Sequence, residues 1–219
     1  IPGLRFEKGE RRIYPHGNLV SHVVGMADVD NKGIAGVEKR FDNALKESHE
    51  PLGLAIDIRV QTIVRKELAR AVDEFSAVGG TGMVMDVRTG EVLAMVSLPA
   101  YDINLFAKGI KINEYDNLIN NADQPLFNRA ISGEYPSGST IKPVMAAAAL
   151  EDGLINEHTT FLSVGGITIG QWFFPDWKSG GHGLVDVKRA LAESINTFFY
   201  YIGGGYQDFK GLGIDRIVF

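Results

Sequence analysis

The sequence predicts a mixed α+β protein, and three observations carry this prediction. A long amphipathic pattern predicts a helix over residues 57–75, two β-prone runs predict a hairpin over residues 83–97, and further helical patterns follow residue 139. The chain of 219 residues is long enough for one large domain, or for one domain with a smaller one, and for a substantial core.

Charge and composition exclude several classes of protein. The net charge of -5 argues against nucleic-acid binding, which normally requires a basic surplus. The absence of cysteine excludes disulfides and thiolate metal ligands. No apolar run approaches the about 20 residues that span a bilayer. Because the chain begins with Ile1 and stops within the apolar stretch 211–219, we expect a piece of a longer protein.

The first 80 residues divide into two parts. Repeated turn signals over residues 1–50 predict short strands and loops, ending in a short helix over residues 36–46. A boundary is expected near residues 50–53. The helix that follows has Asp57 as its N-cap and ends before Gly79.

A hairpin and two irregular regions come next. Runs 83–87 and 92–97 flank a turn at residues 88–91. Residues 102–124 are polar and predict a surface excursion, and residues 161–183 are rich in glycine and aromatics, which indicates short strands and loops near a surface groove. The aromatic side chains of this last region fit core packing better than a peptide groove: Trp172, Phe173, Phe174 and Trp177.

Ser139 and Lys142 are a candidate nucleophile and base. Residues three apart at a helix start share a face, and a lysine whose pKa is lowered can activate a serine hydroxyl. The free N–H groups of a helix start favour an oxyanion, and Pro143 fits the first turn. The alternative is a helix cap followed by a surface lysine, because this spacing arises roughly once by chance in such a chain.

A second candidate pair lies at a helix junction. Asp186 can cap a helix that runs to residue 192, another helix is expected over residues 197–202, and Ser194 and Asn196 stand between them. A hydroxyl beside an amide suits a proton relay and a substrate clamp, although these residues could simply cap the two helices. The two pairs in this order, each at a helix junction, favour a site.

These motifs resemble those of class B penicillin-binding proteins, which are peptidoglycan D,D-transpeptidases. "PSGSTIKP" matches the S-x-x-K motif of the family and Ser194-Ile195-Asn196 its S-x-N motif. "LAIDIRVQTIVRKEL" and "GTGMVMDVRTGEVLAMVSLPAYDIN" resemble the first helix and first hairpin of the transpeptidase domain. "FPDWKSGGHG" and "ESINTFFYYIG" are most similar to the elongation-type subgroup, penicillin-binding protein 2, whereas "DVDNKGIAGVEKRFD" is also similar to the septal type.

The resemblance implies an α/β sandwich that is part of the fold shared by penicillin-binding proteins and serine β-lactamases. Residues 54–219 are expected to form the N-terminal part of the transpeptidase domain, and residues 1–53 the end of a β-rich pedestal or dimerisation-type domain. The third family motif, K-[ST]-G, is expected beyond Phe219, because Lys178-Ser179-Gly180 precedes Ser194 and is interpreted as a loop. The chain by itself is therefore expected not to be catalytically competent.

The resemblance also implies roles for the site residues. Ser139 attacks the penultimate D-Ala carbonyl of a stem peptide, with Lys142 as general base. Ser194 passes a proton to the leaving amine, and Asn196 holds the substrate amide and orients Lys142. An amine of a second stem peptide then takes the acyl group, and β-lactams acylate the same serine.

The expected setting also follows from the resemblance. It implies the extracytoplasmic face of a bacterial membrane, an anchoring N-terminal helix absent from this chain, and a membrane glycosyltransferase of the cell-wall machinery as partner. Some elongation-type relatives carry zinc, and Asp176 and His182 stand where two of its ligands would be, with Ser163 where an acid would be expected. Two residues do not make a zinc site, so no metal and no other cofactor is assigned.

Two other classes of function stay open from the sequence. A serine β-lactamase of related fold would need a deacylating base, and the pedestal-like residues 1–50 argue against it. A β-lactam sensor, or a non-enzymatic scaffold with a degenerate site, would share both motifs.

Overall fold

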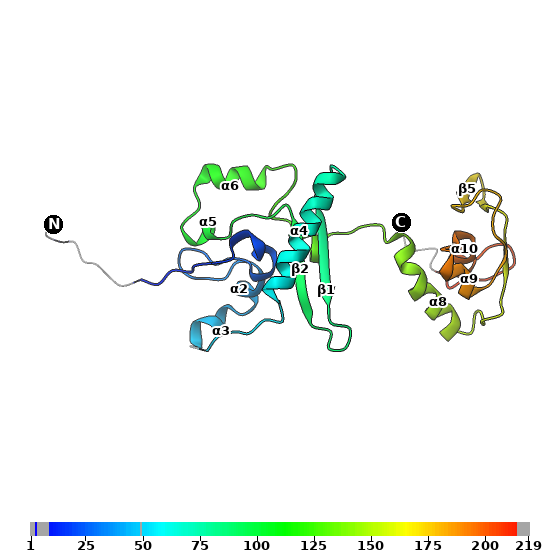
Figure 1. The fold of residues 1–219 in the computed structure, drawn as a ribbon, viewed down its shortest axis with the longest axis horizontal. Coiled ribbons are helices and arrows are strands. Elements are labelled where there is room, and N and C mark those ends of the chain that lie inside the picture. The colour runs from blue at the N-terminus through cyan, green and yellow to red at the C-terminus, as the bar shows by residue number, and fades with distance from the viewer. Residues whose placement is uncertain (1–2, 4–8, 49, 214–219) are drawn as a thin grey trace. The chain divides into compact units, whose positions relative to one another are not determined.

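The computed structural model describes residue 3, residues 9–48 and residues 50–213, and it divides into two compact units, Ile1–Glu134 and Tyr135–Phe219 (Figure 1). Both units contain helices and strands, which confirms the α+β class. The first unit contains residues on both sides of residue 53, and the predicted domain boundary at that position stays a prediction.

The N-terminal part of the first unit is helical. It consists of a short 3-10 helix, η1 (Gly17–Leu19), and three short helices, α1 (Ser21–Val24), α2 (Gly36–Arg40) and α3 (Asp42–Glu47). The expected short strands are wrong for residues 9–48, where the one pairing is an isolated bridge between Ala27 and Gly33. The helix expected over residues 36–46 is present but is interrupted at Phe41.

Two glycines explain why turn signals here do not mark strands. Gly25 and Gly36 both have positive φ, at 74° and 58°. A Cβ on Gly25 would lie 2.0 Å from the carbonyl oxygen of Ala35, so only glycine allows this approach of two backbones. The glycines thus join α1 to α2, two elements that contact each other.

The helix and hairpin predicted next are confirmed. Helix α4 (Ile58–Glu74) begins at Asp57, whose side chain accepts a hydrogen bond from the backbone N–H of Arg59 at 2.8 Å. Strands β1 (Gly80–Met85) and β2 (Val92–Leu98) are antiparallel, and α4 packs along both (Figure 1). The buried Gln61 fastens α4 to β2, because its amide donates to the carbonyl of Met95 and accepts from the N–H of the same residue.

Three short helices follow β2 in the first unit: α5 (Asn104–Ala107), α6 (Ile112–Ile119) and α7 (Arg129–Ser132). The expectation that residues 102–124 form a surface excursion is wrong for its beginning. Ile103, Phe106 and Ala107 are buried in a cluster with Tyr14, Val20 and Tyr101. Ile103, Phe106 and Ala107 recur at the spacing of one helix face, and their burial packs this segment onto the rest of the first unit.

The second unit contains the elements predicted after residue 139. These are η2 (Gly138–Ile141), α8 (Lys142–Glu151), β3 (Phe161–Ser163), β4 (Gly166–Ile169), β5 (Trp172–Pro175), β6 (Gly183–Val185), α9 (Val187–Ala192) and α10 (Asn196–Gly204). Strand β3 pairs with β6 and β4 with β5, both antiparallel. The predicted helices and short strands are confirmed, with the difference that the turn containing Ser139 is 3-10.

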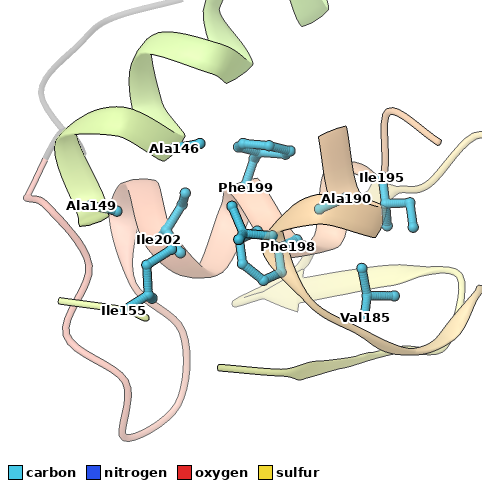
Figure 2. Packing of buried hydrophobic residues seen from close by; sticks show 10 residues of the cluster. Ala146, Ala149, Ile155, Val185, Ala190, Ile195, Phe198, Phe199 and Ile202 are labelled. Carbon is cyan, nitrogen blue, oxygen red and sulfur yellow. The ribbon is translucent and has the colours of Figure 1, made fainter. Parts of the chain in front are cut away.

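The core of the second unit fixes α8 against α10. Figure 2 shows Ala146 and Ala149 of α8 facing Phe199 and Ile202 of α10. The small alanine side chains let the two helices come close, and burial of the larger residues stabilises the contact. This packing brings the N-terminal ends of the two helices, and with them Lys142 and Asn196, into hydrogen-bonding distance.

The aromatic residues around β5 do not pack in this core. Trp172, Phe173 and Trp177 are more than 60% exposed, and Phe174 is also exposed, so the preference for core packing is wrong. Lys178-Ser179-Gly180 lies in a turn before β6, as predicted. Over the described parts of the chain, none of the helices combines the length and the apolar character needed to cross a bilayer.

Candidate active site

Ser139 lies on an exposed 3-10 turn directly before α8. Gly138 has a φ of 55°, which favours glycine and turns the chain sharply into the helix. The backbone N–H of Lys142 donates to the carbonyl of Ser139, and Pro143 stands in the first turn of α8, where a backbone N–H would have no acceptor within the helix. The local sequence therefore presents the Ser139 hydroxyl to solvent on a well-defined backbone.

Lys142 is buried, and its ammonium group has three hydrogen-bond acceptors. Nζ donates to the carbonyl of Ser194 at 2.8 Å, to Ser194 Oγ at 3.0 Å and to Asn196 Oδ1 at 2.7 Å. It also lies 5.3 Å from the ring centre of Phe199. Burial lowers the pKa of Lys142, and the negative charge of Asp176 opposes this effect.

Ser194 occupies the joint between α9 and α10 in a left-handed conformation, with a φ of 53°. The next residue, Ile195, is fully buried, and its N–H donates to the carbonyl of Ala190 at 3.0 Å. A non-glycine residue in this region costs about 1–2 kcal/mol. The strained joint directs both the carbonyl and the hydroxyl of Ser194 to the same ammonium group.

A continuous hydrogen-bond chain joins the four predicted residues. Ser194 Oγ accepts from Lys142 Nζ and donates to Ser139 Oγ at 3.0 Å, while Asn196 holds Lys142 from the other side. The expected pairing of Ser139 with Lys142 therefore runs through Ser194 in this structure. The sequence spacing predicted that Ser139 and Lys142 share one helix face, but in the structure the hydroxyl of Ser194 bonds to both side chains.

Behind this chain, the Asp176 carboxylate accepts hydrogen bonds on both oxygens. Oδ1 accepts from the backbone N–H of Thr197 at 3.2 Å. Oδ2 accepts from Ser163 Oγ at 2.8 Å and from Thr197 Oγ1. Burial raises the pKa of Asp176, but the hydrogen bonds from Thr197 and Ser163 outweigh it and hold this pKa below its usual value.

The residues around Asp176 do not fit a zinc ion. His182 Nδ1 lies 3.9 Å from Asp176 Oδ2 and 3.4 Å from Ser163 Oγ. Structural zinc is held by four ligands of thiolate, imidazole or carboxylate type, and here the other two neighbours are the neutral hydroxyls of Ser163 and Thr197. Within the described ranges, no three acidic, histidine or cysteine side chains gather as a metal site. Asp176 and His182 are therefore the two side chains of metal-ligating type that the structure places in this cluster.

Sequence reasoning missed two contributors to the site. Thr197 was expected only as the first residue of a helix, yet it makes two contacts with Asp176. The carbonyl of Pro175 accepts from Asn196 Nδ2 at 3.2 Å and from Tyr200 at 3.3 Å. Neither contact has a local sequence signal, because both join residues more than 20 positions apart.

The arrangement can activate a hydroxyl for acyl transfer. An exposed serine is linked through a second hydroxyl to a buried lysine, and burial lowers the pKa of this lysine, which makes its neutral form easier to reach. A base that takes the proton of a serine makes it a nucleophile toward carbonyl carbon. The geometry thus defines the class of serine enzymes that use lysine in place of histidine.

Comparison with known proteins agrees with this class. The family model described as the penicillin binding protein transpeptidase domain matches residues 80–208. The chain belongs to this family.

Three relatives show how the similarity is distributed. The peptidoglycan D,D-transpeptidase MrdA of Acinetobacter baumannii is 33% identical, over 99% of this chain and 37% of its own length. Pseudomonas aeruginosa PBP2, solved in complex with WCK 5153, has a TM-score of 0.74 at 30% identity and covers 87% of this chain and 46% of its own.

The third relative is penicillin-binding protein A of M. tuberculosis, solved as a penicillin G acyl-enzyme complex. Its TM-score is 0.71 at 26% identity, over 88% of this chain and 50% of its own. The A. baumannii relative and the P. aeruginosa structure confirm the resemblance to penicillin-binding protein 2. The chain spans about two fifths of the length of the curated relatives it matches.

Proposed function

We propose that the protein is a peptidoglycan D,D-transpeptidase that cross-links stem peptides through an acyl-enzyme on Ser139. The observation that carries the proposal is the chain of hydrogen bonds from buried Lys142 through Ser194 to exposed Ser139. The name of the A. baumannii relative supports the reaction, and the acyl-enzyme of the M. tuberculosis protein supports a β-lactam as an alternative acyl donor.

Acylation begins when Lys142 is neutral. The hydroxyl protons of Ser139 and Ser194 then turn toward the lysine, so that the proton of Ser139 moves to Ser194 Oγ and that of Ser194 moves to Lys142 Nζ. Ser139 Oγ forms a bond to the penultimate D-Ala carbonyl carbon. The C–N bond to the terminal D-Ala breaks, and the same chain returns a proton to its amine.

Transfer reverses these proton movements. An amine of a second stem peptide attacks the ester carbonyl, loses a proton to the chain and releases Ser139. Asn196 contributes by fixing Lys142 with Oδ1, while its Nδ2 is held by the Pro175 carbonyl. Its role as a clamp for the substrate amide would require this second bond to be exchanged.

The setting of the reaction follows from its substrate. Stem peptides of peptidoglycan place the protein at the extracytoplasmic face of a bacterial membrane. Because cross-linking needs newly polymerised glycan strands, we propose a membrane glycosyltransferase as its partner. Nucleic acid is not a proposed partner, in keeping with the net charge of -5.

Labelling with a fluorescent penicillin tests the proposal. The full-length protein should form a stable covalent adduct, and Ser139→Ala should abolish it because the acylated oxygen is gone. The matched control is Ser137→Ala, since Ser137 is exposed on the same turn but offers only its carbonyl to Thr140. Rapid turnover of nitrocefin would instead identify a β-lactamase. Labelling that survives Ser139→Ala would contradict the assignment of the nucleophile.

A further inference from the structure

The buried carboxylate of Asp176 has no place in the reaction steps above, yet it is bonded to the residue next to Asn196. We propose that Asp176 is a positioning residue, which holds the start of α10 at Lys142 through hydrogen bonds from protein groups and without a metal ion. This inference rests on the proposed function, because the groups it positions are those of the acylation step.

The contacts of Asp176 tie three segments together. The N–H and hydroxyl of Thr197 reach it from the first turn of α10. The hydroxyl of Ser163 reaches it from β3. Its own N–H donates to the Gly165 carbonyl at 2.8 Å, which fixes the end of β5. A carboxylate that accepts hydrogen bonds on both oxygens has one orientation, so the start of α10 has one position.

That position is the one Lys142 requires. Asn196 directly precedes Thr197, and its Oδ1 is the acceptor closest to Lys142 Nζ, at 2.7 Å. Its Nδ2 is bonded to Pro175, the residue before Asp176. Asn196 is thus held on two sides, by its own bond to Pro175 and by the bonds of the adjacent Thr197 to Asp176. A shift of α10 would move the Asn196 oxygen that orients Lys142.

The same contacts argue against a metal in this cluster. Ser163 Oγ and Thr197 Oγ1 both donate to Oδ2, so both lone pairs of this oxygen already accept hydrogen bonds and are not free for a cation. The backbone of His182 is fixed as well, because its amide N–H donates to both the carbonyl and the hydroxyl of Ser163, at 3.1 and 3.2 Å, whereas its buried imidazole Nε2 has no hydrogen-bond partner among the described residues. The hydroxyls of Ser163 and Thr197 and the amide N–H of Thr197 thereby stabilise the buried carboxylate, which would otherwise need a cation beside it.

Titratable groups face this cluster from several elements. They are Lys142 on α8, His182 before β6, Glu193 after α9 and Tyr200 on α10. The charge of Asp176 acts on two of them, since it raises the pKa of both Lys142 and Tyr200. Removal of the charge should therefore be visible in the pH dependence of acylation.

Substitution of Thr197 tests the hydrogen bond without changing the charge. Thr197→Val keeps the shape of the side chain but loses the hydroxyl, whereas Thr197→Ser keeps the hydroxyl. In the full-length protein, we expect Thr197→Val to slow acylation by fluorescent penicillin by about 10–100-fold, because a small misplacement of reacting groups costs this much. Thr197→Ser should restore most of the rate. Equal rates in the two variants would overturn the proposal.

Substitution of Asp176 by asparagine tests the charge. Its rate at the optimum should fall by a similar factor, and the limb along which the rate rises with pH should move to lower pH, because Lys142 loses a charge that favours its protonated form. Asp186→Asn is the matched control, since Asp186 caps α9 by accepting from the N–H of Arg189. Because asparagine can also cap a helix through its Oδ1, this variant should leave both the stability and the limb nearly unchanged. A limb that stays in place in Asp176→Asn would overturn the proposal.

Measurement of metal content, together with acylation before and after chelation, tests the metal-free arrangement independently of the proposed function. The purified wild-type protein should acylate at the same rate before and after treatment with a chelator. Stoichiometric zinc that is lost in His182→Ala, with slower acylation after chelation, would overturn the metal-free arrangement. Failure of the wild type to react with penicillin at all would instead contradict the proposed function.

Discussion

Lys142 combines two properties that are hard to obtain together in one side chain. It is buried, which favours the neutral form, and its Nζ has three acceptors, which hold the protonated form. Burial is the larger effect on its pKa, which lies below the ordinary lysine value. The proton of Lys142 is therefore held by three acceptors and is nevertheless easier to remove than that of an ordinary lysine.

The pH dependence of acylation should report this property. The rate should rise with pH as Lys142 loses its proton, along a limb that lies below the ordinary lysine pKa of about 10.4. Lys142→Arg should lose about 10²–10⁴-fold at every pH, because a guanidinium cannot act as the base. Stopped-flow acylation of the full-length protein with a chromogenic β-lactam would measure both. A limb retained in Lys142→Arg would exclude lysine as the base.

At the scale of elements, the joint between α9 and α10 contains a strained backbone, and this strained conformation orients the side chain of Ser194 toward Lys142. Ser194 adopts a φ of 53°, which glycine would adopt without cost. Strained backbone is often found at functional sites, where the surrounding structure maintains it. Here the buried Ile195 and its bond to Ala190 supply that support.

Ser194→Gly and Ser194→Ala should therefore separate stability from activity. Both remove the hydroxyl that links Ser139 to Lys142, so both should slow acylation by about 10²-fold or more. Ser194→Gly should be more stable than Ser194→Ala by about 1 kcal/mol, because it relieves the left-handed strain. Thermal unfolding and acylation rates of the two variants give the comparison. Equal stability of the pair would show that the joint is unstrained.

The elements that sequence predicted well carry strong local signals. Helix α4 has a cap at Asp57 and a periodic apolar face, and the hairpin has a glycine turn between two β-prone runs. The interruption at Phe41 and the burial of Phe106 had no such signal, because both depend on which distant surface is available for packing. The exposure of Trp172 could not be predicted either, because it also depends on which distant surface is available for packing.

The site shows the same division between local and distant information. Two short motifs at helix starts predicted that Ser139, Lys142, Ser194 and Asn196 belong together, and the structure joins these side chains by hydrogen bonds. The order in which they connect was not predictable, since the bond from Ser194 to Ser139 joins residues 55 positions apart. Asp176 was noticed as a possible metal ligand, and only its contacts show that hydroxyls surround it.

At the scale of the whole molecule, the first unit depends on a close approach that a single methyl group would disturb. A Cβ on Gly79, just before β1, would lie 2.4 Å from the carbonyl oxygen of Leu98 and 2.8 Å from Nε of Arg129. The carbonyl belongs to the paired strand and cannot move freely. Glycine here allows the open end of the hairpin to close.

Gly79→Ala should accordingly destabilise the protein by about 1–3 kcal/mol. For a chain of this size, each kcal/mol lowers Tm by about 2–4 °C. Gly53→Ala is the control, because a Cβ there meets nothing within 4 Å. Calorimetry of the two variants beside the wild type would measure the difference. An unchanged Tm in Gly79→Ala would mean that the hairpin end opens at little cost.

One consequence follows from the alternation of residues 194–196. Ile195 is fully buried in the core of the second unit (Figure 2). Its two neighbours in sequence, Ser194 and Asn196, accept hydrogen bonds from Lys142. A change in the size of the Ile195 side chain is therefore expected to move the backbone that carries Ser194 and Asn196. A substitution of Ile195 should therefore change the stability of the protein and the rate of acylation together. Sequence changes that alter only one of the two are expected at other positions.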